Sequence, residues 1–190
     1  MEYILLLTAC INPDGMPFTC LADVGVRKKQ YIEALNFYLK NTTRKIVFVE
    51  NSGTDISSSF KDFQHRIEFL CFDGNLCFDK RKGKGYGEAL ILEYAMAKSE
   101  FITDDVLIFK LTGRLQLINI NRLIHYMDKL SPSKNFVCVV PPQNNSVDSR
   151  CFVCNKYYLE NIFLKDKFHI DDSVGYLSLI HISEPTRQAE

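Results

Sequence analysis

Two lysines and three glycines stand together near the middle of the chain, and residues of these types bind phosphate groups. Lys82 and Lys84 alternate with Gly83, Gly85 and Gly87, just before a long apolar stretch with helical spacing. Glycine allows a ligand to approach the backbone closely, and lysine supplies positive charge. A helix that begins here would add free backbone N–H groups. The run therefore predicts a phosphate-binding loop that opens a helix, and the alternative is a solvated surface loop.

The glycine run does not match two familiar phosphate-binding motifs. It lacks the Gly-Lys-Ser/Thr ending of a Walker A loop. Its glycines do not have the dinucleotide-binding spacing, and it does not lie in the first tight turn between a strand and a helix. Neither ATP hydrolysis through a Walker loop nor dinucleotide binding is therefore predicted.

A second group of cations follows in the apolar segment 106–114. Lys110 lies within a run typical of a buried strand, and Thr112, Gly113 and Arg114 come directly after it. A buried ammonium is costly unless it reaches solvent, forms an ion pair or binds a ligand. Arg114, placed after a bend, offers a planar guanidinium to a phosphate. We expect this strand end to contribute positive charge to the same place as the glycine run.

The elements that would position these residues alternate between strands and helices. Apolar runs at 3–11, 45–49, 67–72 and 106–111 predict buried strands, and shorter ones at 136–140 and 147–153 extend the set. Helical spacing appears after Arg27, after the glycine run and at 157–164. Continuous apolar strands with helices between them predict an α/β fold, with a mostly parallel sheet covered by helices on both faces in a single domain.

Ligands of such sheets bind beyond the carboxyl ends of the strands. Thr8 lies at the predicted end of the first strand, and Glu50 and Asn51 at that of the second. Arg27 stands where the loop after the first strand enters a helix, so its charge either faces solvent or meets an anion. We expect these residues to flank the ligand.

Composition excludes some functions. Acidic and basic residues number 23 each, so no nucleic-acid partner and no polybasic membrane patch are predicted. Seven cysteines, mostly within apolar runs, indicate a reducing, cytoplasmic environment. The segment Ile4–Leu7 is too short for a membrane span and lacks a basic flank, so it predicts a strand. Cys151 and Cys154 have no second ligand pair and are interpreted as structural, not as a zinc site.

The last residues need a separate interpretation. Residues 177–187 resemble the translation of a transposase adapter used in shotgun sequencing, and 188–190 would then be an index sequence. Such segments are excluded from fold reasoning. We expect the authentic domain to occupy residues 1–176 and to lack its C-terminal part, with 177–190 as an artefact.

Several motifs together resemble bacterial glycosyltransferases of the GT-A type, found among capsule and lipopolysaccharide gene sets. They are Lys82–Glu88, Phe109–Arg114 with Asn119, Thr8–Ile11 and Glu50–Gly53. The resemblance implies that Thr8 and Glu50 flank the nucleotide base and ribose, and that the glycine run covers the sugar diphosphate. Asp148 and Arg150 resemble an Asp-x-Arg element near the donor site, with an internal salt bridge as the alternative. Asp171 and Asp172 resemble the stretch before the acceptor site, beyond which an inverting enzyme carries its base.

This sequence departs from the family at the metal site. Lys110, Thr112 and Arg114 stand where the family's Asp-x-Asp metal ligands are expected. Fixed cations can stabilise the charge that develops on a departing diphosphate. The hypothesis is a metal-independent glycosyl transfer without a cofactor, in which Lys110 and Arg114 clamp the diphosphate. The predicted catalytic residues are Lys110, Arg114 and Asp148; the predicted binding residues are Thr8, Arg27, Glu50, Asn51, Lys82, Lys84, Gly85, Gly87, Thr112 and Arg150.

The implied partners are a nucleotide-sugar donor and a glycan or lipid-linked acceptor, with peripheral contact at the inner face of the membrane through the missing C-terminal part. Two other classes stay open. A nucleotidyltransferase also uses an α/β sheet, a basic glycine-rich loop and diphosphate chemistry, but normally needs Mg²⁺ held by carboxylates. A noncatalytic module that binds nucleotide sugars has the same binding requirements.

Overall fold

The computed structural model describes residues 2–76, 79–129, 136–138 and 149–170. Its centre is a six-stranded sheet with the order β3-β2-β1-β4-β6-β5. The strands are β1 (Glu2–Ala9), β2 (Ile46–Glu50), β3 (Ile67–Cys71), β4 (Val106–Thr112), β5 (Phe136–Cys138) and β6 (Cys151–Asn155). The first four are parallel, whereas β6 pairs antiparallel with both β4 and β5. The predicted α/β fold with a mostly parallel sheet is confirmed, and the sheet is Rossmann-like.

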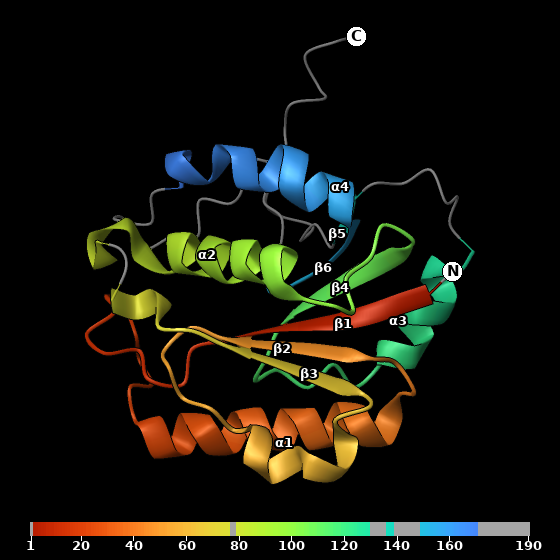
Figure 1. Cartoon of the computed structure of the whole chain (residues 1–190), viewed down its shortest axis with the longest axis horizontal. Coiled ribbons are helices and arrows are strands. Elements are labelled where there is room, and N and C mark those ends of the chain that lie inside the picture. The colour runs from red at the N-terminus through yellow and green to blue at the C-terminus, as the bar shows by residue number, and fades with distance from the viewer. Residues whose placement is uncertain (1, 77–78, 130–135, 139–148, 171–190) are drawn as a thin grey trace, which may run out of the picture.

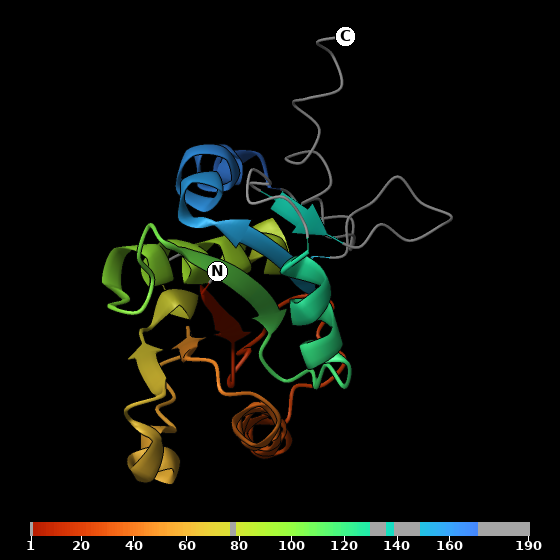
Figure 2. The ribbon, with the colours of Figure 1, turned by 90° about the vertical axis from the view of Figure 1, so that its right-hand side faces the viewer.

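Helices cover both faces of the sheet (Figure 1). The α-helices are α1 (Val24–Asn41), α2 (Gly83–Lys98), α3 (Ile120–Met127) and α4 (Lys156–Tyr158). A π-helical stretch at Leu159–Phe163 and a 3-10 stretch at Leu164–His169 continue α4, and further 3-10 segments lie at Ser57–Phe63, Gly74–Leu76 and Lys80–Lys82. Figure 2 shows α1 end-on beneath the sheet, with α2 and α4 on the opposite face.

Strand β1 explains this two-sided packing. Every residue of β1 from Tyr3 to Ala9 is buried, and successive side chains point to opposite faces. Leu5 and Leu7 belong to the apolar cluster that includes α1 and α3, whereas Ile4 and Leu6 belong to the one that includes α2. A strand that is buried on both faces has no polar side, which is why its sequence is continuously apolar.

The order of the strands fixes where a ligand pocket belongs. The chain runs outward from β1 to β2 and β3, and then returns to place β4 on the other side of β1. The strand order therefore reverses between β1 and β4, and ligands of open α/β sheets bind in the crevice beyond the carboxyl ends at such a point.

The structure corrects the prediction of a glycine-rich loop. Residues Gly83 to Gly87 form the first turns of α2 instead of a loop. Gly83 has φ +84°, a conformation that favours glycine, and this bend separates α2 from the 3-10 turn at Lys80–Lys82. Tyr86 and Ala89 pack into the cluster beneath α2. Their burial outweighs the cost of glycine in a helix, about 0.5–1 kcal/mol per residue.

Candidate functional site

A pocket of about 400 Å³ opens at the carboxyl ends of β1 and β4. Its walls come from the end of β1 and the loop that follows, the first turns of α1 and α2, the end of β4 and the start of β6. Eight of the residues predicted from the sequence line it, and they are Thr8, Arg27, Asn51, Lys84, Gly87, Thr112, Arg114 and Arg150. The pocket therefore lies at the switch point of the sheet.

Four of the predicted site residues lie outside this pocket, and a fifth lies outside the described residues. Glu50 and Lys110 are buried behind its walls, Gly85 is buried within α2, and Lys82 is exposed. The Lys82 ammonium lies 4.4 Å from the centre of the Tyr86 ring. Asp148 lies outside the described residues, as do Asp171 and Asp172 and the proposed artefact at 177–190.

Lys110 does not reach the pocket, which corrects its predicted role as a direct clamp. Its side chain is 0% exposed, and its ammonium forms an ion pair with Glu88 Oε1. The same ammonium donates a hydrogen bond to Ser149 O at 2.6 Å. The physical reason is the cost of a buried charge, which the strand meets by pairing Lys110 with a carboxylate on α2. Glu88, which does line the pocket, was not among the predicted residues.

The end of β4 presents Arg114 through a tight bend. Gly113 N donates to Thr8 O at 2.8 Å, which ties the bend to the end of β1. A Cβ atom on Gly113 would lie 2.8 Å from the same Thr8 oxygen, so no larger residue fits this close approach. Thr112 N donates to Arg150 O at 2.9 Å, which brings Arg150 to the same edge. Two guanidinium groups therefore line one side of the pocket.

Arg27 has a structural task in addition to lining the pocket. Its Nε donates to Cys10 O at 2.9 Å, and its Nη1 donates to Leu21 O at 3.1 Å. These two carbonyl groups stand at the two ends of the loop that follows β1. Arg27 therefore holds the loop closed on α1, while its charge still adds to the positive field of the pocket.

Glu50 organises the loops beside the pocket instead of facing a ligand. Its carboxylate, on a residue only 1% exposed, accepts hydrogen bonds from Ile11 N at 2.8 Å, Ser52 N at 2.9 Å and Thr54 N at 2.8 Å. A carboxylate occupied by three backbone donors is a loop anchor. The carboxylate is turned toward these amides, and the expected place of Glu50 beside the nucleotide base and ribose stays a prediction.

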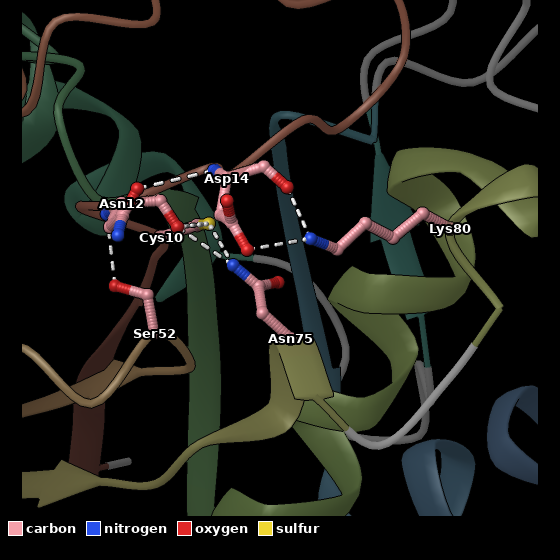
Figure 3. Close-up of polar contacts among 6 residues, drawn as sticks. All are labelled: Cys10, Asn12, Asp14, Ser52, Asn75 and Lys80. Atoms are coloured by element: carbon pink, nitrogen blue, oxygen red, sulfur yellow. Dashed lines mark hydrogen bonds and ion pairs between the residues drawn. The ribbon is translucent and has the colours of Figure 1, made fainter.

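A polar network joins the loop after β1 to the rest of the rim (Figure 3). Asn75 Nδ2 donates to Asn12 O at 2.7 Å, and Ser52 Oγ accepts from Asn12 N at 2.9 Å. Lys80 donates to the carbonyl oxygen of Asp14 and pairs with its carboxylate at 3.0 Å. Lys84 similarly donates to Phe18 O. The loop is thus held over the pocket by groups from four other segments.

Asn51 and Tyr31 add neutral polar groups to the pocket. Asn51 is 2% exposed, and its side-chain Oδ1 has no hydrogen-bond partner among the described residues. Tyr31, which the sequence did not suggest, accepts a hydrogen bond from Cys10 N at 3.0 Å through its hydroxyl group. Burial raises the pKa of the Tyr31 hydroxyl and also that of the neighbouring Cys10 thiol. Both groups are therefore protonated at neutral pH.

The pocket's charge is positive overall. Arg27, Lys84, Arg114 and Arg150 line it, and Glu88 is the one carboxylate among the described lining residues. In the same described ranges, no group of three or more His, Cys, Asp or Glu side chains is placed to hold a metal ion. Such a lining suits an anion with several oxygen acceptors.

The two cysteines of the Cys-x-x-Cys pair point to opposite faces of the sheet. Cys151 packs against the cluster under α1, whereas Cys154 is buried in the cluster under α2. No disulfide joins the two within the part of the chain that the structure describes. Their structural interpretation agrees with this geometry.

The fold and the site define a Rossmann-like α/β protein with a cation-lined pocket at the switch point of its sheet. No protein-family model matches the chain, and no curated protein matches it. Among solved structures, 4-diphosphocytidyl-2C-methyl-D-erythritol synthase is similar, with a TM-score of 0.43 and 11% sequence identity over 95% of this chain and 84% of that chain. A likeness of this size carries no argument about function. Within the described ranges, none of the helices has the length and apolar character that a membrane crossing requires.

Proposed function

We propose that the pocket binds a nucleotide sugar and that the protein is a glycosyltransferase. The observation that carries this proposal is the meeting of Arg114, Arg150 and Lys84 with the hydroxyl group of Thr112 at one pocket. Guanidinium and ammonium groups bind phosphate oxygens, and the hydroxyl group adds a neutral donor. A diphosphate offers enough oxygen atoms to engage all of them.

The span of the pocket supports an elongated ligand with two chemically different ends. Asn51 follows β2 and Arg114 follows β4, with β1 between these strands. Neighbouring strands lie about 4.8 Å apart, so the two ends are separated by roughly 10 Å. The β4 end carries the guanidinium groups of Arg114 and Arg150, whereas the β2 end carries an amide. We assign the diphosphate to the β4 end and the nucleoside to the β2 end.

The proposed reaction uses the cations to stabilise the leaving group. A hydroxyl group of the acceptor attacks the anomeric carbon, its proton passes to a base, and the bond from that carbon to the diphosphate breaks. Negative charge then develops on the nucleoside diphosphate, and preorganised cations stabilise it as it forms. Arg114 and Arg150 are the proposed catalytic groups, and no step requires a metal ion. The acceptor in this proposal is a glycan or a lipid-linked glycan of a surface polysaccharide.

Binding of phosphate-containing probes to the full chain tests the proposal. We expect pyrophosphate, a nucleoside diphosphate and a nucleotide sugar to bind, in calorimetric titrations, with and without Mg²⁺. Loss of one charge-assisted contact, in Arg114→Ala or Arg150→Ala, should weaken pyrophosphate binding about tenfold or more. Arg122→Ala is the matched control, because Arg122 is exposed on α3 and outside the pocket.

The same titrations separate glycosyl transfer from nucleotidyl transfer. A nucleotidyltransferase would bind a nucleoside triphosphate in a Mg²⁺-dependent manner and release pyrophosphate from it. Tight binding of a nucleotide sugar that is unaffected by chelation of metals supports the glycosyltransferase. Pyrophosphate release that depends on Mg²⁺, or pyrophosphate binding that survives both arginine substitutions, would reject the proposal.

A further inference from the structure

One carboxylate faces a pocket that is otherwise suited to anions. Glu88 stands on the second turn of α2, one helical turn beyond Lys84, and both side chains line the pocket. A carboxylate repels phosphate oxygens, so its presence among the cations needs a separate explanation. Its side chain is 16% exposed, which leaves part of it open to a ligand.

The position of this carboxylate is fixed from behind. Glu88 Oε1 is ion-paired with Lys110 and accepts a hydrogen bond from Thr8 Oγ1 at 3.0 Å. Lys110 is itself fixed by Ser149 O at 2.6 Å and lies with its ammonium 5.5 Å from the centre of the Phe152 ring. A carboxylate held by two donors on one oxygen has little freedom to rotate. Its other oxygen, Oε2, is therefore preorganised.

Glu88 Oε2 accepts no hydrogen bond from the part of the chain that the structure describes. An ionised carboxylate only accepts hydrogen bonds, so its ligand must bring a donor. Phosphate oxygens bring none once they are ionised, whereas the hydroxyl groups of a sugar ring do. We infer that Glu88 is a specificity-determining residue that accepts a hydrogen bond from a sugar hydroxyl of the bound nucleotide sugar.

This inference rests on the proposed function and makes it more specific. The hydroxyl belongs either to the transferred sugar or to the ribose, since both carry the same chemistry. A site built to accept a hydrogen bond from a substrate hydroxyl discriminates strongly against an analogue that lacks it, because a buried acceptor is then left unpaired. The protein would therefore select its ligand by a hydroxyl group in addition to its diphosphate.

The test replaces the ion pair as a unit. Glu88→Gln alone would leave the buried Lys110 ammonium unpaired and risks unfolding. The double variant Glu88→Leu with Lys110→Met removes one negative and one positive charge, so the net charge beside the pocket is unchanged. Thr8 keeps a second acceptor, Leu111 O at 3.4 Å. Glu93→Gln is the control, because Glu93 lies on the same helix in an ion pair with Lys167 outside this pocket.

A panel of nucleoside diphosphates and nucleotide sugars with the common bases is first titrated into the wild-type chain. Calorimetric titrations of the variants then use pyrophosphate and the nucleoside diphosphate and nucleotide sugar that the wild type binds most tightly. We expect the double variant to bind the nucleotide sugar about tenfold more weakly and pyrophosphate as tightly as before. If the double variant also binds the nucleoside diphosphate more weakly, and binds its 2′-deoxy form as the wild type does, the hydroxyl belongs to the ribose. If the nucleoside diphosphate is unaffected, the hydroxyl belongs to the transferred sugar.

Two results would overturn the inference while leaving the proposed function intact. In one, the double variant binds all probes as the wild type does. In the other, its affinities for pyrophosphate and for the nucleotide sugar fall to the same extent, which indicates a structural role for the pair. A wild-type chain that binds none of the probes would instead reject the proposed function, and this inference with it.

Discussion

Lys110 of β4 and Glu88 of α2 form an ion pair whose ammonium is fully buried and whose carboxylate borders the pocket. The pair joins the central sheet to the helix above it at the point where the proposed ligand binds. Its energetic value depends on both partners, because the Lys110 ammonium is fully buried and the Glu88 carboxylate compensates its charge. Lys110 was predicted to contact the ligand, whereas in the structure it supports Glu88.

Removing one partner should therefore cost much more than removing both. We expect Lys110→Met to lower the free energy of unfolding by about 3–5 kcal/mol, as is typical when one charge of a buried pair is lost. The double variant with Glu88→Leu should recover most of this loss. Urea unfolding measures both, with Lys28→Met, at an exposed position of α1, as the control. A single variant as stable as the control would show that the pair contributes little.

Much of the fold is predictable from the sequence because its strands are buried on both faces. Continuous apolar runs such as that of β1 have one plausible structure, and their parallel order follows from the helices between them. The glycine run was harder to interpret. Glycine has a low helix propensity, and only the packing of Tyr86 and Ala89 against the sheet shows that α2 begins at Gly83.

The site was predictable in its location and less so in its details. Residues at strand ends, such as Thr8, Asn51 and Arg114, meet because parallel strands end at one edge. Glu88 carried two signals that were available in the sequence. It lies four residues after Lys84, and so on the same helix face, and the buried Lys110 required a carboxylate partner. Which carboxylate that was depends on how α2 sits over β4, and local sequence does not encode that.

Glu50 should be important for stability, not for catalysis. Its carboxylate accepts three backbone N–H groups from two loops. We expect Glu50→Gln to lower the free energy of unfolding by about 2–3 kcal/mol, because a charged acceptor is lost and the new NH₂ group faces other donors. Chemical unfolding of this variant is compared with that of Glu33→Gln, an exposed residue of α1. If the two variants were equally stable, the anchoring role of Glu50 would be wrong.

Lys80 and Lys84 allow the support of the loop to be separated from ligand binding. Lys80 contacts Asp14 and Lys84 contacts Phe18 O, and both Asp14 and Phe18 have positive φ angles, of 35° and 55°. Such conformations cost about 1–3 kcal/mol in residues other than glycine, so contacts must maintain them. We expect Lys80→Met and Lys84→Met each to increase hydrogen exchange in the loop.

Only one of these two variants should affect binding. Lys84 lines the pocket, whereas Lys80 does not, so Lys84→Met should weaken pyrophosphate binding several-fold and Lys80→Met should leave it nearly unchanged. The two substitutions are chemically identical and lie four residues apart, which makes each the control for the other. Equal losses of affinity would mean that the loop, and not the charge of Lys84, determines binding.

Alkaline pH should destabilise the fold partly through Cys71. Burial, followed by the charge of Glu50, raises the pKa of the Cys71 thiol from 9.0 to about 11. Between these values the thiol ionises in the unfolded chain but stays protonated in the folded one. The unfolded chain then binds fewer protons than the folded chain. The contribution of the Cys71 thiol to the free energy of unfolding is therefore fully present below pH 9.0 and is lost as the pH rises toward 11.

Urea midpoints measured across this range should fall more steeply for the wild type than for Cys71→Ala. The comparison concerns the slope with pH, because the substitution also removes packing atoms at every pH; parallel slopes would show that Cys71 is not responsible.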